Sequence, residues 1–350
     1  MPAPSPDKSP LRVLIVRIGA MGDVLHAMPA VAALREKMPE AHIGWAIETR
    51  WASLLPARTA QGSVLVDHIH NVPVREWKAS PLNFATVLSI LALRRELRKE
   101  KYDLVVDLQG TIRSSFIGRL AAAARFAGSA TPWETPARIF YSQKVAIQQT
   151  HVVDQACQIL GAAVGLKLTP AMPILEKNAA AEAWCDGVVK DISRFVLLSA
   201  GGGWGAKCWP PERYGAVAVG LQQRGYTVLV AAANDRDELA QRVVAASDGS
   251  AQGVICNLPQ LAALLRRAAL CVAGDTGPLH LAAALGTPVV GIYGPTDPAR
   301  NGPFTQKKLI LRSLESTTDH SRHAEAEAGL LHISVEDVIH SGLELLEPIP

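Results

Sequence analysis

The chain alternates between short apolar runs rich in β-branched residues and longer segments whose apolar residues recur with helical spacing. Such runs predict buried strands, and the 3.6-residue period predicts helices that pack one face against them. In the first half, strands are predicted at 11–18, 41–47, 64–69 and 102–108, and helices at 24–38, 82–101 and 150–165. A further helix is expected to begin within 109–115, whereas 133–145 has no regular pattern. Strands that alternate with helices in this way indicate parallel βαβ units.

The alternation starts again after residues 166–179, which contain two prolines and are typical of a linker. The second series has predicted strands at 195–199, 227–231, 253–255 and 288–293, a further strand at the start of 271–286, and helices at 212–224, 237–247, 261–269 and 334–346. Two halves of similar architecture predict an α/β protein of two facing Rossmann-like domains with a cleft between them. Ligands of such open sheets bind at the carboxyl ends of the strands, so the turns there are the candidate sites.

Composition narrows the class of protein. Hydrophobic residues make up 49% of the 350 residues, but no apolar run reaches the roughly 18–20 residues of a membrane span. Five scattered cysteines without a CxxC pair argue against a disulfide framework or a zinc site and favour a reducing cytoplasm. A net charge of +3 and an aromatic content of 5% permit an anionic partner but do not point to nucleic acid.

The predicted domains follow from these patterns. Residues 1–10 are too polar and too rich in proline for a signal peptide and are expected to form a disordered lead. An N-terminal domain is predicted at 11–178 and a C-terminal domain at 179–333. The last segment, 334–350, is predicted to contain a helix that packs back on the N-terminal domain.

The stretch Cys271–Gly286 has the pattern of a buried strand, a tight turn and a helix start. Thr276 can cap this helix, and Pro278 suits its first turn, because a missing N–H costs nothing there. The free N–H groups and the partial positive charge of a helix N-terminus favour a phosphate. Asp275, Thr276 and His280 surround the same point, although a capped helix with a surface histidine explains the turn alone equally well.

A second candidate lies near the N-terminus, where Gly19 and Gly22 allow a tight turn before a helix that begins with Asp23. In the functional interpretation Asp23 is a general base. The partial positive charge of the helix N-terminus keeps the Asp23 carboxylate ionised but makes it a weak base. Asp23 therefore acts only if proton transfer comes late, as charge develops on the attacking oxygen. The alternative is an ordinary helix-capping aspartate.

The third candidate is the glycine loop 200–206, which imitates a dinucleotide fingerprint with its G-x-G-x-x-A pattern after a strand. The match is weak, because the helix begins only after a pair of prolines and the next acidic residue, Asp235, comes too late. Lys207 is not followed by Ser or Thr, so this is not a Walker A loop either. A loop with backbone amides at Gly202 and Gly203 that ends in a lysine suits a pyrophosphate leaving group. The alternative interpretation is a glycine loop whose lysine is solvated.

Cationic residues of the first half form a fourth group, which contains Arg75, Lys78 and Arg113. They could hold an acidic acceptor. Taken alone, however, these charges are more typical of a solvated basic surface.

Together these motifs resemble the ADP-heptose:lipopolysaccharide heptosyltransferases, glycosyltransferase family 9, which have the two-domain GT-B fold. The resemblance covers most of residues 11–298, and the order and spacing of its motifs make it specific. The matching pieces are Met21-Gly-Asp-Val-Leu-His26 with Pro29-Ala30, Asp107-Leu-Gln-Gly110, Lys207-x-Trp-Pro210, Asp275-Thr-Gly-Pro-Leu-His280 and Tyr293-Gly-Pro-Thr-Asp297. Three further motifs are similar to the heptosyltransferase I branch of the family. This branch adds the first heptose to the Kdo of the inner core. The motifs are Arg75-x-Trp77-Lys78, Phe140-Tyr141-x-x-Lys144 and Gln149-x-His151.

The resemblance implies an inverting, metal-independent transfer of heptose from ADP-heptose to the Kdo region of the lipopolysaccharide inner core, without a cofactor. No DxD-type carboxylate pair indicates a metal site. Asp23 would be the general base, and Lys207 would hold the leaving ADP. The implied donor-binding residues are Gly202, Gly203, Glu238, Asp275, Thr276, Gly277 and His280, and the implied acceptor-binding residues are Arg75, Lys78, Gln109 and Arg113. The glycine loop departs from the branch, in which threonines or other polar side chains are expected before the lysine.

The implied partners are ADP-heptose and an acceptor of the Kdo–lipid A type, and a monomer that does not bind nucleic acid is expected. Because this acceptor is membrane-anchored, the resemblance implies a cytoplasmic protein in transient contact with the cytoplasmic face of the inner membrane. Three alternatives stay open: another GT-B nucleotide-sugar enzyme, such as an epimerase, a hydrolase or one with a different sugar donor; an NAD-dependent oxidoreductase, which rests on the glycine loop alone; and a nucleotide-binding module without activity.

Overall fold

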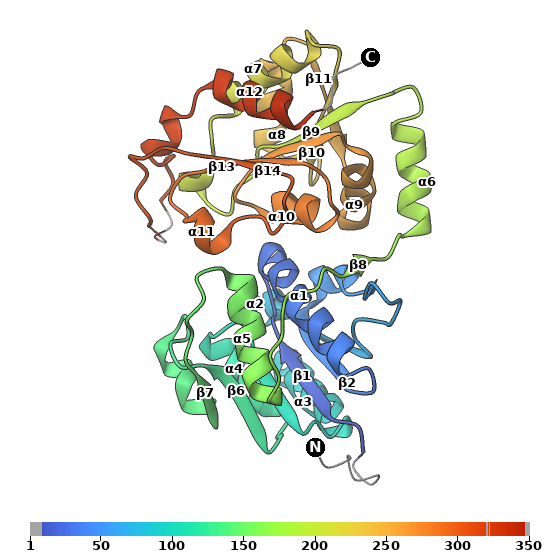
Figure 1. Ribbon diagram of the computed structural model, residues 1–350, viewed down its shortest axis with the longest axis vertical. Helices are drawn as coiled ribbons and strands as arrows, with labels where there is room; N and C mark the ends of the chain where they lie inside the picture. The colour runs from blue at the N-terminus through green and yellow to red at the C-terminus, as the bar shows by residue number, and fades with distance from the viewer. Residues whose placement is uncertain (1–8, 320, 322, 347–350) are drawn as a thin grey trace. The chain divides into compact units, whose positions relative to one another are not determined.

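The structure, a computed structural model, describes residues 9–319, 321 and 323–346 (Figure 1). The chain divides between Glu176 and Lys177 into two compact units, each with its own six-stranded sheet. This division lies two residues before the predicted boundary at 178. Most of the predicted lead, residues 1–8, and the end of the predicted last segment, residues 347–350, lie outside the described residues.

The sheet of the first unit is parallel throughout and has the strand order β4-β2-β1-β5-β6-β7. Its strands are β1 (Arg12–Val16), β2 (His42–Glu48), β4 (His68–Val72), β5 (Leu104–Asp107), β6 (Arg125–Ser129) and β7 (Gln143–Val145). Counted along the chain, this is the order 3-2-1-4-5-6 of a doubly wound Rossmann sheet. Two short strands outside it, β3 (Ala57–Arg58) and β8 (Ile174–Leu175), form an antiparallel pair.

Helices cover this sheet, with α1 packed on α5 and α3 packed on α4 (Figure 1). Their bounds are α1 (Met21–Lys37), α2 (Val74–Ala79), α3 (Phe84–Lys99), α4 (Ile112–Leu120) and α5 (Val152–Val164), with 3₁₀ turns η1 (Thr49–Leu54) and η2 (Thr135–Phe140). The helix predicted at 24–38 contains Pro29, yet α1 begins three residues earlier than predicted and continues through this proline. Nearly every residue from Val24 to Arg35 is buried, so tertiary packing outweighs the hydrogen bond that the proline removes.

The sheet of the second unit repeats the same topology in the order β11-β10-β9-β12-β13-β14, again parallel throughout. Its strands are β9 (Phe195–Ser199), β10 (Thr227–Ala232), β11 (Ala251–Ile255), β12 (Leu270–Gly274), β13 (Val289–Tyr293) and β14 (Lys308–Arg312). The helices are α6 (Ala179–Val188), α7 (Pro211–Gln222), α8 (Glu238–Ala246), α9 (Leu258–Arg267), α10 (Gly277–Ala284), α11 (Pro298–Asn301) and α12 (Val335–Leu345), with 3₁₀ turns η3 (Gly205–Lys207) and η4 (Gly329–His332). The predicted α/β class with two Rossmann-like units is therefore confirmed.

The last helix, α12, packs within the second unit against α7 and the strands β12, β13 and β14 (Figure 1). Val338 is buried in the same hydrophobic core as Trp209, Val217 and Leu270. The prediction that this helix packs back on the N-terminal domain stays a prediction. The apolar face of α12 has a direct partner in its own sheet, which the sequence pattern could not identify.

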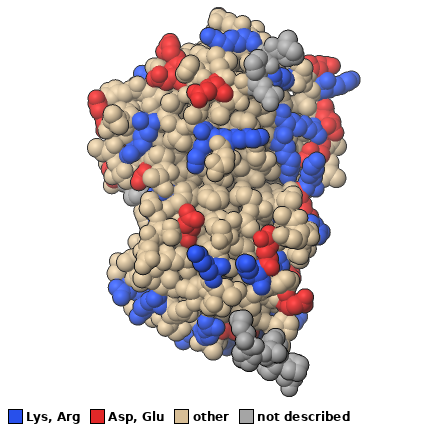
Figure 2. Space-filling view, in the orientation of Figure 1, with Lys and Arg blue, Asp and Glu red and all other residues tan. Residues whose placement is uncertain are grey.

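On the face drawn in Figure 2, charged side chains are scattered rather than gathered by sign. The face in Figure 2 is mostly formed by uncharged residues, with basic and acidic side chains interspersed among them. No field of a single sign therefore covers the described part of this face.

Candidate active site

Each sheet has one point at which the strand order reverses direction, and the candidate residues follow the strands at these points. In the first unit this point lies between β1 and β5, and in the second unit between β9 and β12. Ligands of doubly wound sheets bind at the carboxyl ends of the strands beside such a point. The loops concerned are 17–23 and 108–113 in the first unit, and 200–210 and 275–277 in the second.

Asp23 is the third residue of α1 and binds the start of its own helix. Its Oδ2 accepts a hydrogen bond from the N–H of Ala20 at 2.9 Å, and its Oδ1 lies 2.7 Å from Nη2 of Arg17. The side chain is 46% exposed. The carboxylate is therefore fixed in orientation on one side and open to a ligand on the other, which suits both interpretations drawn from the sequence.

Arg17 is a site residue that the sequence analysis missed. It follows the buried strand β1, and its side chain is largely buried between Asp23 and the backbone oxygen of Leu108, to which its Nη1 donates. It thereby links the two loops at the reversal point. The available signal was a charged residue at the end of an otherwise apolar run.

Gln109, a predicted acceptor ligand, takes part in the same link. Its side-chain oxygen accepts hydrogen bonds from the N–H groups of Ile18 at 2.8 Å and Gly19 at 3.4 Å. This oxygen is committed to the loop after β1, so the NH₂ group is the part of Gln109 that can meet a ligand.

Asp107 shapes the loop that follows β5. It is 1% exposed, and its Oδ2 accepts hydrogen bonds from the hydroxyl groups of Ser114, Ser115 and Tyr141 at 2.8–2.9 Å. Its Oδ1 accepts from the N–H groups of Gln109 and Gly110 at 2.8 and 3.0 Å. With five donors, this carboxylate is saturated and is a structural brace for the loop.

The predicted acceptor cations are all exposed, but only one of them is connected to the Asp23 loop by a contact. Nε of Arg75 lies 3.9 Å from Oε1 of Glu48 at the end of β2. A Cβ atom on Gly19 would lie 3.7 Å from the other oxygen of Glu48, so this carboxylate borders the turn that leads to Asp23. Lys78 lies in the last turn of α2 and Arg113 in the first turn of α4, and no ion pair joins either to the loop among the described residues.

In the second unit, Lys207, Asp275 and His280 form a buried triad across the reversal point. Nζ of Lys207 lies 2.5 Å from Oδ2 of Asp275, and Nε2 of His280 lies 3.0 Å from Oδ1. Burial alone raises the pKa of Asp275, but the hydrogen bond from His280 and the charge of Lys207 outweigh it and hold this pKa far below its usual range. Both carboxylate oxygens are thus occupied by donors, and Asp275 stays ionised.

The glycine loop places Lys207 against an aromatic ring. Its Nζ lies 4.4 Å from the centroid of the Trp204 ring, a distance typical of a cation–π contact. Gly202 is packed closely, because a Cβ atom there would lie 2.6 Å from Sγ of Cys208. Gly203, by contrast, has nothing within 4 Å of an added Cβ atom and borders open space.

Thr276 occupies the N-cap position of α10, but its side chain does not cap the helix as the sequence predicted. Its hydroxyl donates instead to the backbone oxygen of Gly274 at 3.2 Å. The N–H groups of the first turn, beginning with Gly277, therefore keep their capacity for a ligand, except at Pro278, which has none. Glu238, the remaining predicted donor residue, is exposed at the first position of α8, after the strand β10 that pairs with β9.

The segment between β14 and α12 lies against the loops of the second unit. The N–H of Ala206 donates to the oxygen of His323 at 3.1 Å, and the N–H of Glu327 donates to the oxygen of Ala206 at 3.2 Å. The N–H of Asp319 donates to the oxygen of Pro295 at 2.9 Å. This segment therefore fixes both the lysine loop and the turn after β13.

Comparison with known proteins identifies the family. Residues 90–332, more than half of the chain, match glycosyltransferase family 9 (heptosyltransferase). The chain belongs to this family. It is 27% identical over 314 residues to lipopolysaccharide heptosyltransferase 1 of Escherichia coli (strain K12), covering 87% of this chain and 94% of that protein. The identity to lipopolysaccharide heptosyltransferase 1 of Pseudomonas aeruginosa is also 27%, over 310 residues, with 87% and 84% covered.

Solved structures agree with the family 9 fold. The Escherichia coli heptosyltransferase WaaC with ADP superposes with a TM-score of 0.77 at 24% identity, covering 96% of this chain and all of that one. A family 9 glycosyltransferase from Veillonella parvula gives a TM-score of 0.79 at 20% identity, with 96% and 97% covered. The GT-B class implied by the sequence motifs is thus confirmed, and the protein is a glycosyltransferase rather than an oxidoreductase.

A helix that crosses a membrane must be both long and apolar. Among residues 9–319, 321 and 323–346, none of the helices combines the length and the apolar character that crossing a membrane requires.

Proposed function

We propose that this family 9 protein transfers heptose from ADP-heptose to the Kdo region of the lipopolysaccharide inner core. The observation that carries the proposal is the extent of similarity to heptosyltransferase 1 proteins, which spans 87% of this chain. It is supported by the structural similarity to a WaaC structure with ADP and to one with ADP-2-deoxy-2-fluoro heptose. The reaction needs a base that takes the proton of the acceptor hydroxyl and a cradle of residues that binds the leaving diphosphate. The first unit carries a candidate for the base, and the second unit carries a candidate for the cradle.

In the proposed reaction, Asp23 is the general base. The acceptor hydroxyl oxygen forms a bond to the anomeric carbon of the heptose while the bond from that carbon to the phosphate oxygen breaks. The hydroxyl proton passes to the Asp23 carboxylate, and the bonding electrons leave with ADP. Arg17 holds this carboxylate in a fixed orientation for the proton that is released as charge develops on the attacking oxygen.

The proposed diphosphate cradle consists of Lys207 and the first N–H groups of α10 at Thr276 and Gly277. A lysine cation and a helix N-terminus both stabilise the negative charge that accumulates on the leaving group. Gly203, which borders open space, allows the backbone of the lysine loop to approach the donor closely.

The role proposed for Asp275 differs from direct donor binding. Its two oxygens are occupied by Lys207 and His280, and a buried carboxylate repels a diphosphate. We assign it a positioning role: it holds the ammonium group of Lys207 and the ring of His280 in place. Gly202 likewise supports the loop through its close packing on Cys208 rather than through a donor contact.

A coupled assay of ADP release tests the proposed function. ADP is expected to appear only when ADP-heptose and a Kdo–lipid A acceptor are both present. ADP or an altered heptose formed rapidly without acceptor would instead support a hydrolase or an epimerase. Donor binding without turnover on any Kdo–lipid A acceptor would support a binding module.

Variants of two arginines of α4 test the proposed acceptor-binding residues in the same assay. Arg113→Glu is expected to raise the acceptor KM by more than about tenfold, because a charge-assisted hydrogen bond contributes about 1.5–3 kcal/mol. Arg119, exposed in the last turn of the same helix, is the matched control, and Arg119→Glu is expected to leave the KM unchanged. Equal KM values in the two variants would remove Arg113 from the acceptor site, with Arg75 and Lys78 as the next candidates.

The proposed acceptor is part of a membrane, and α3 offers a surface for contact with it. Leu82, two residues before this helix, is 96% exposed, and Phe84, its first residue, is 74% exposed; Val87 and Leu88 are exposed one turn further. Exposed basic residues continue the same side of the helix at Arg94, Arg95 and Arg98. An apolar stripe that continues into a basic one fits the surface of an anionic bilayer, and this supports a proposed location at the cytoplasmic face of the inner membrane.

Sedimentation with phospholipid vesicles tests this contact. The wild type is expected to bind vesicles that contain phosphatidylglycerol and not vesicles of phosphatidylcholine alone. Leu82→Ser/Phe84→Ser should weaken binding by more than tenfold, because burying one such side chain is worth about 1.5–3 kcal/mol. Ile139→Ser/Ile174→Ser, which alters two exposed side chains elsewhere in the first unit, is the control. Equal losses in both double variants, or no binding by the wild type, would contradict this surface.

A further inference from the structure

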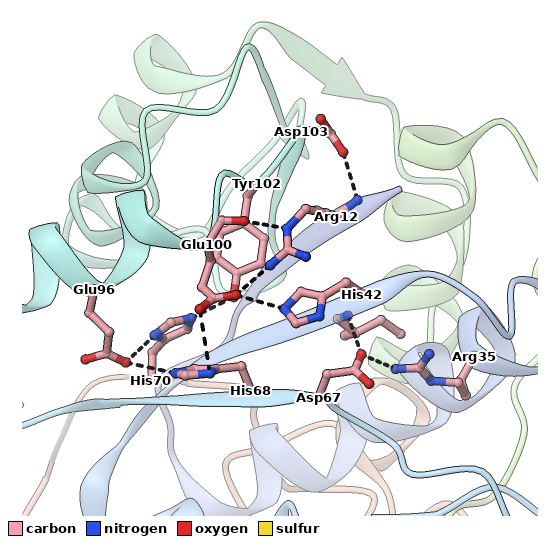
Figure 3. Close-up of polar contacts among 11 residues, drawn as sticks. Arg12, Arg35, His42, Asp67, His68, His70, Glu96, Glu100, Tyr102 and Asp103 are labelled. Carbon is pink, nitrogen blue, oxygen red and sulfur yellow. Dashed lines mark hydrogen bonds and ion pairs between the residues drawn. The ribbon is translucent and has the colours of Figure 1, made fainter. Parts of the chain in front are cut away.

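A cluster of histidines and glutamates lies between the edge strand β4 and the end of α3 in the first unit (Figure 3). His68 and His70 are two residues apart on β4, so their side chains point to the same face of the sheet. Glu96 and Glu100 are four residues apart at the end of α3, so both face the same side of that helix. The cluster begins with the first residue of β4, whereas the candidate site follows the carboxyl ends of the strands.

Three ligand atoms of this cluster converge. Nδ1 of His70 and Nε2 of His68 lie 2.5 and 3.2 Å from the same oxygen of Glu96. The ligand atoms of these three residues all lie within 4.8 Å of one another, the single such group among the described residues. Ligands at 2.0–2.2 Å from a tetrahedral zinc ion lie about 3.4 Å apart, so small side-chain rotations accommodate an ion.

The buried histidine also has a partner for its second nitrogen. His70 is 0% exposed, and its Nε2 lies 2.7 Å from the hydroxyl of Tyr102. The absence of a side chain at Gly44 makes room for this hydroxyl, because a Cβ atom there would lie 1.9 Å from it. Metal-binding histidines commonly have such an oxygen partner on the other ring nitrogen, which fixes the tautomer and the ring orientation.

The charges around the cluster leave one carboxylate for a cation. Glu100 is engaged by Arg12, with Nη2 at 2.5 Å, and by His42, with Nε2 at 3.2 Å. Glu96 has only the two imidazoles as partners in the contacts of this cluster. His68 and Glu96 are 39% and 44% exposed, so an ion can enter from solvent on this side.

We propose that His68 Nε2, His70 Nδ1 and the Glu96 carboxylate bind a divalent transition-metal ion, with water completing its coordination. Two imidazoles and one carboxylate are the ligand set of Zn²⁺, Co²⁺ or Ni²⁺ rather than of Mg²⁺ or Ca²⁺. The ion ties the edge strand β4 to α3 and stabilises the first unit. It takes no part in the transfer reaction. No local motif indicates the site, because His68 and Glu96 are 28 residues apart.

Titration of the untagged, full-length, chelator-treated protein with Co²⁺ and Zn²⁺ tests this site. Co²⁺ is expected to give visible absorption bands that Zn²⁺ abolishes, and Zn²⁺ but not Mg²⁺ is expected to raise the Tm. His68→Gln and Glu96→Gln alter partly exposed side chains and are therefore expected to fold, and they should bind Co²⁺ at least about tenfold more weakly.

His332→Gln is the matched control. Nδ1 of His332 lies 3.1 Å from Oε2 of Glu315, so the second unit has an exposed imidazole–carboxylate pair without a second histidine in that pair. This variant is expected to bind Co²⁺ as the wild type does. A wild type without absorption bands and without a Tm shift, or wild-type affinity in His68→Gln, would overturn the proposal.

Discussion

Asp23→Asn is expected to abolish heptose transfer while ADP affinity and stability stay close to those of the wild type. The asparagine oxygen can still accept the hydrogen bond from the N–H of Ala20, so the start of α1 is preserved. The amide cannot take the proton of the acceptor hydroxyl, and loss of a general base typically costs 10²–10⁴ in rate, as an order of magnitude. The measurements are kcat by ADP release, the Kd for ADP by calorimetry and the Tm.

Asp337 provides a control that matches the helix position. It is the third residue of α12, as Asp23 is of α1, and its Oδ2 accepts from the N–H of the N-cap residue Ser334 at 3.3 Å. Asp337→Asn is expected to leave kcat unchanged. If Asp23→Asn kept more than about a tenth of the wild-type rate, less than about 1.4 kcal/mol of transition-state stabilisation would be involved, and Asp23 would not be the base.

Apart from β6, which was missed, the central strands could be predicted from the sequence because they are continuous apolar runs buried on both faces. The predicted strand at 195–199 coincides with β9, and that at 227–231 differs from β10 by one residue. A parallel sheet covered by helices leaves little room for polar residues in such strands. The continuous apolar run that identifies such a strand in the sequence is therefore also what its burial on both faces requires.

The edge strands could not be predicted in the same way. β4 was predicted at 64–69 but spans His68–Val72, because its polar histidines face the glutamates of α3 rather than an apolar core. The strands β7 and β14 were missed, since Gln143, Lys144 and Lys308 interrupt their apolar character. An edge strand is buried on fewer sides, so its sequence is less constrained.

For the candidate site, the sequence identified single residues but not their partners. Asp23, Lys207 and His280 were selected from motifs, and these roles stay predictions. The pairing of Lys207 with Asp275 joins residues 68 positions apart, and the link from Arg17 to Leu108 joins residues 91 apart. Such contacts depend on which strands become neighbours in the sheet, which local patterns do not determine.

Lys207→Met is expected to weaken ADP binding, slow the transfer and destabilise the second unit at the same time. Loss of the ammonium group removes the cation of the proposed cradle. It also leaves the buried carboxylate of Asp275 with His280 as its remaining partner in the triad. Removing one member of a buried ion pair typically lowers the free energy of unfolding by about 3–5 kcal/mol. The Kd for ADP, kcat and urea denaturation measure the three effects.

The double variant Lys207→Met/Asp275→Asn separates chemistry from stability. It contains no buried charge at this position, so its free energy of unfolding should recover most of the loss, whereas its ADP affinity and kcat should stay low. Because the folded-state pKa of Asp275 is depressed, the stability from its pairing is present above the unfolded-state pKa of about 3.9 and is lost as the pH falls below it. The acid side of the stability curve should therefore be flatter in the double variant than in the wild type. If the double variant regained activity together with stability, Lys207 would serve the fold alone, and the diphosphate charge would have to be met by the N–H groups of α10.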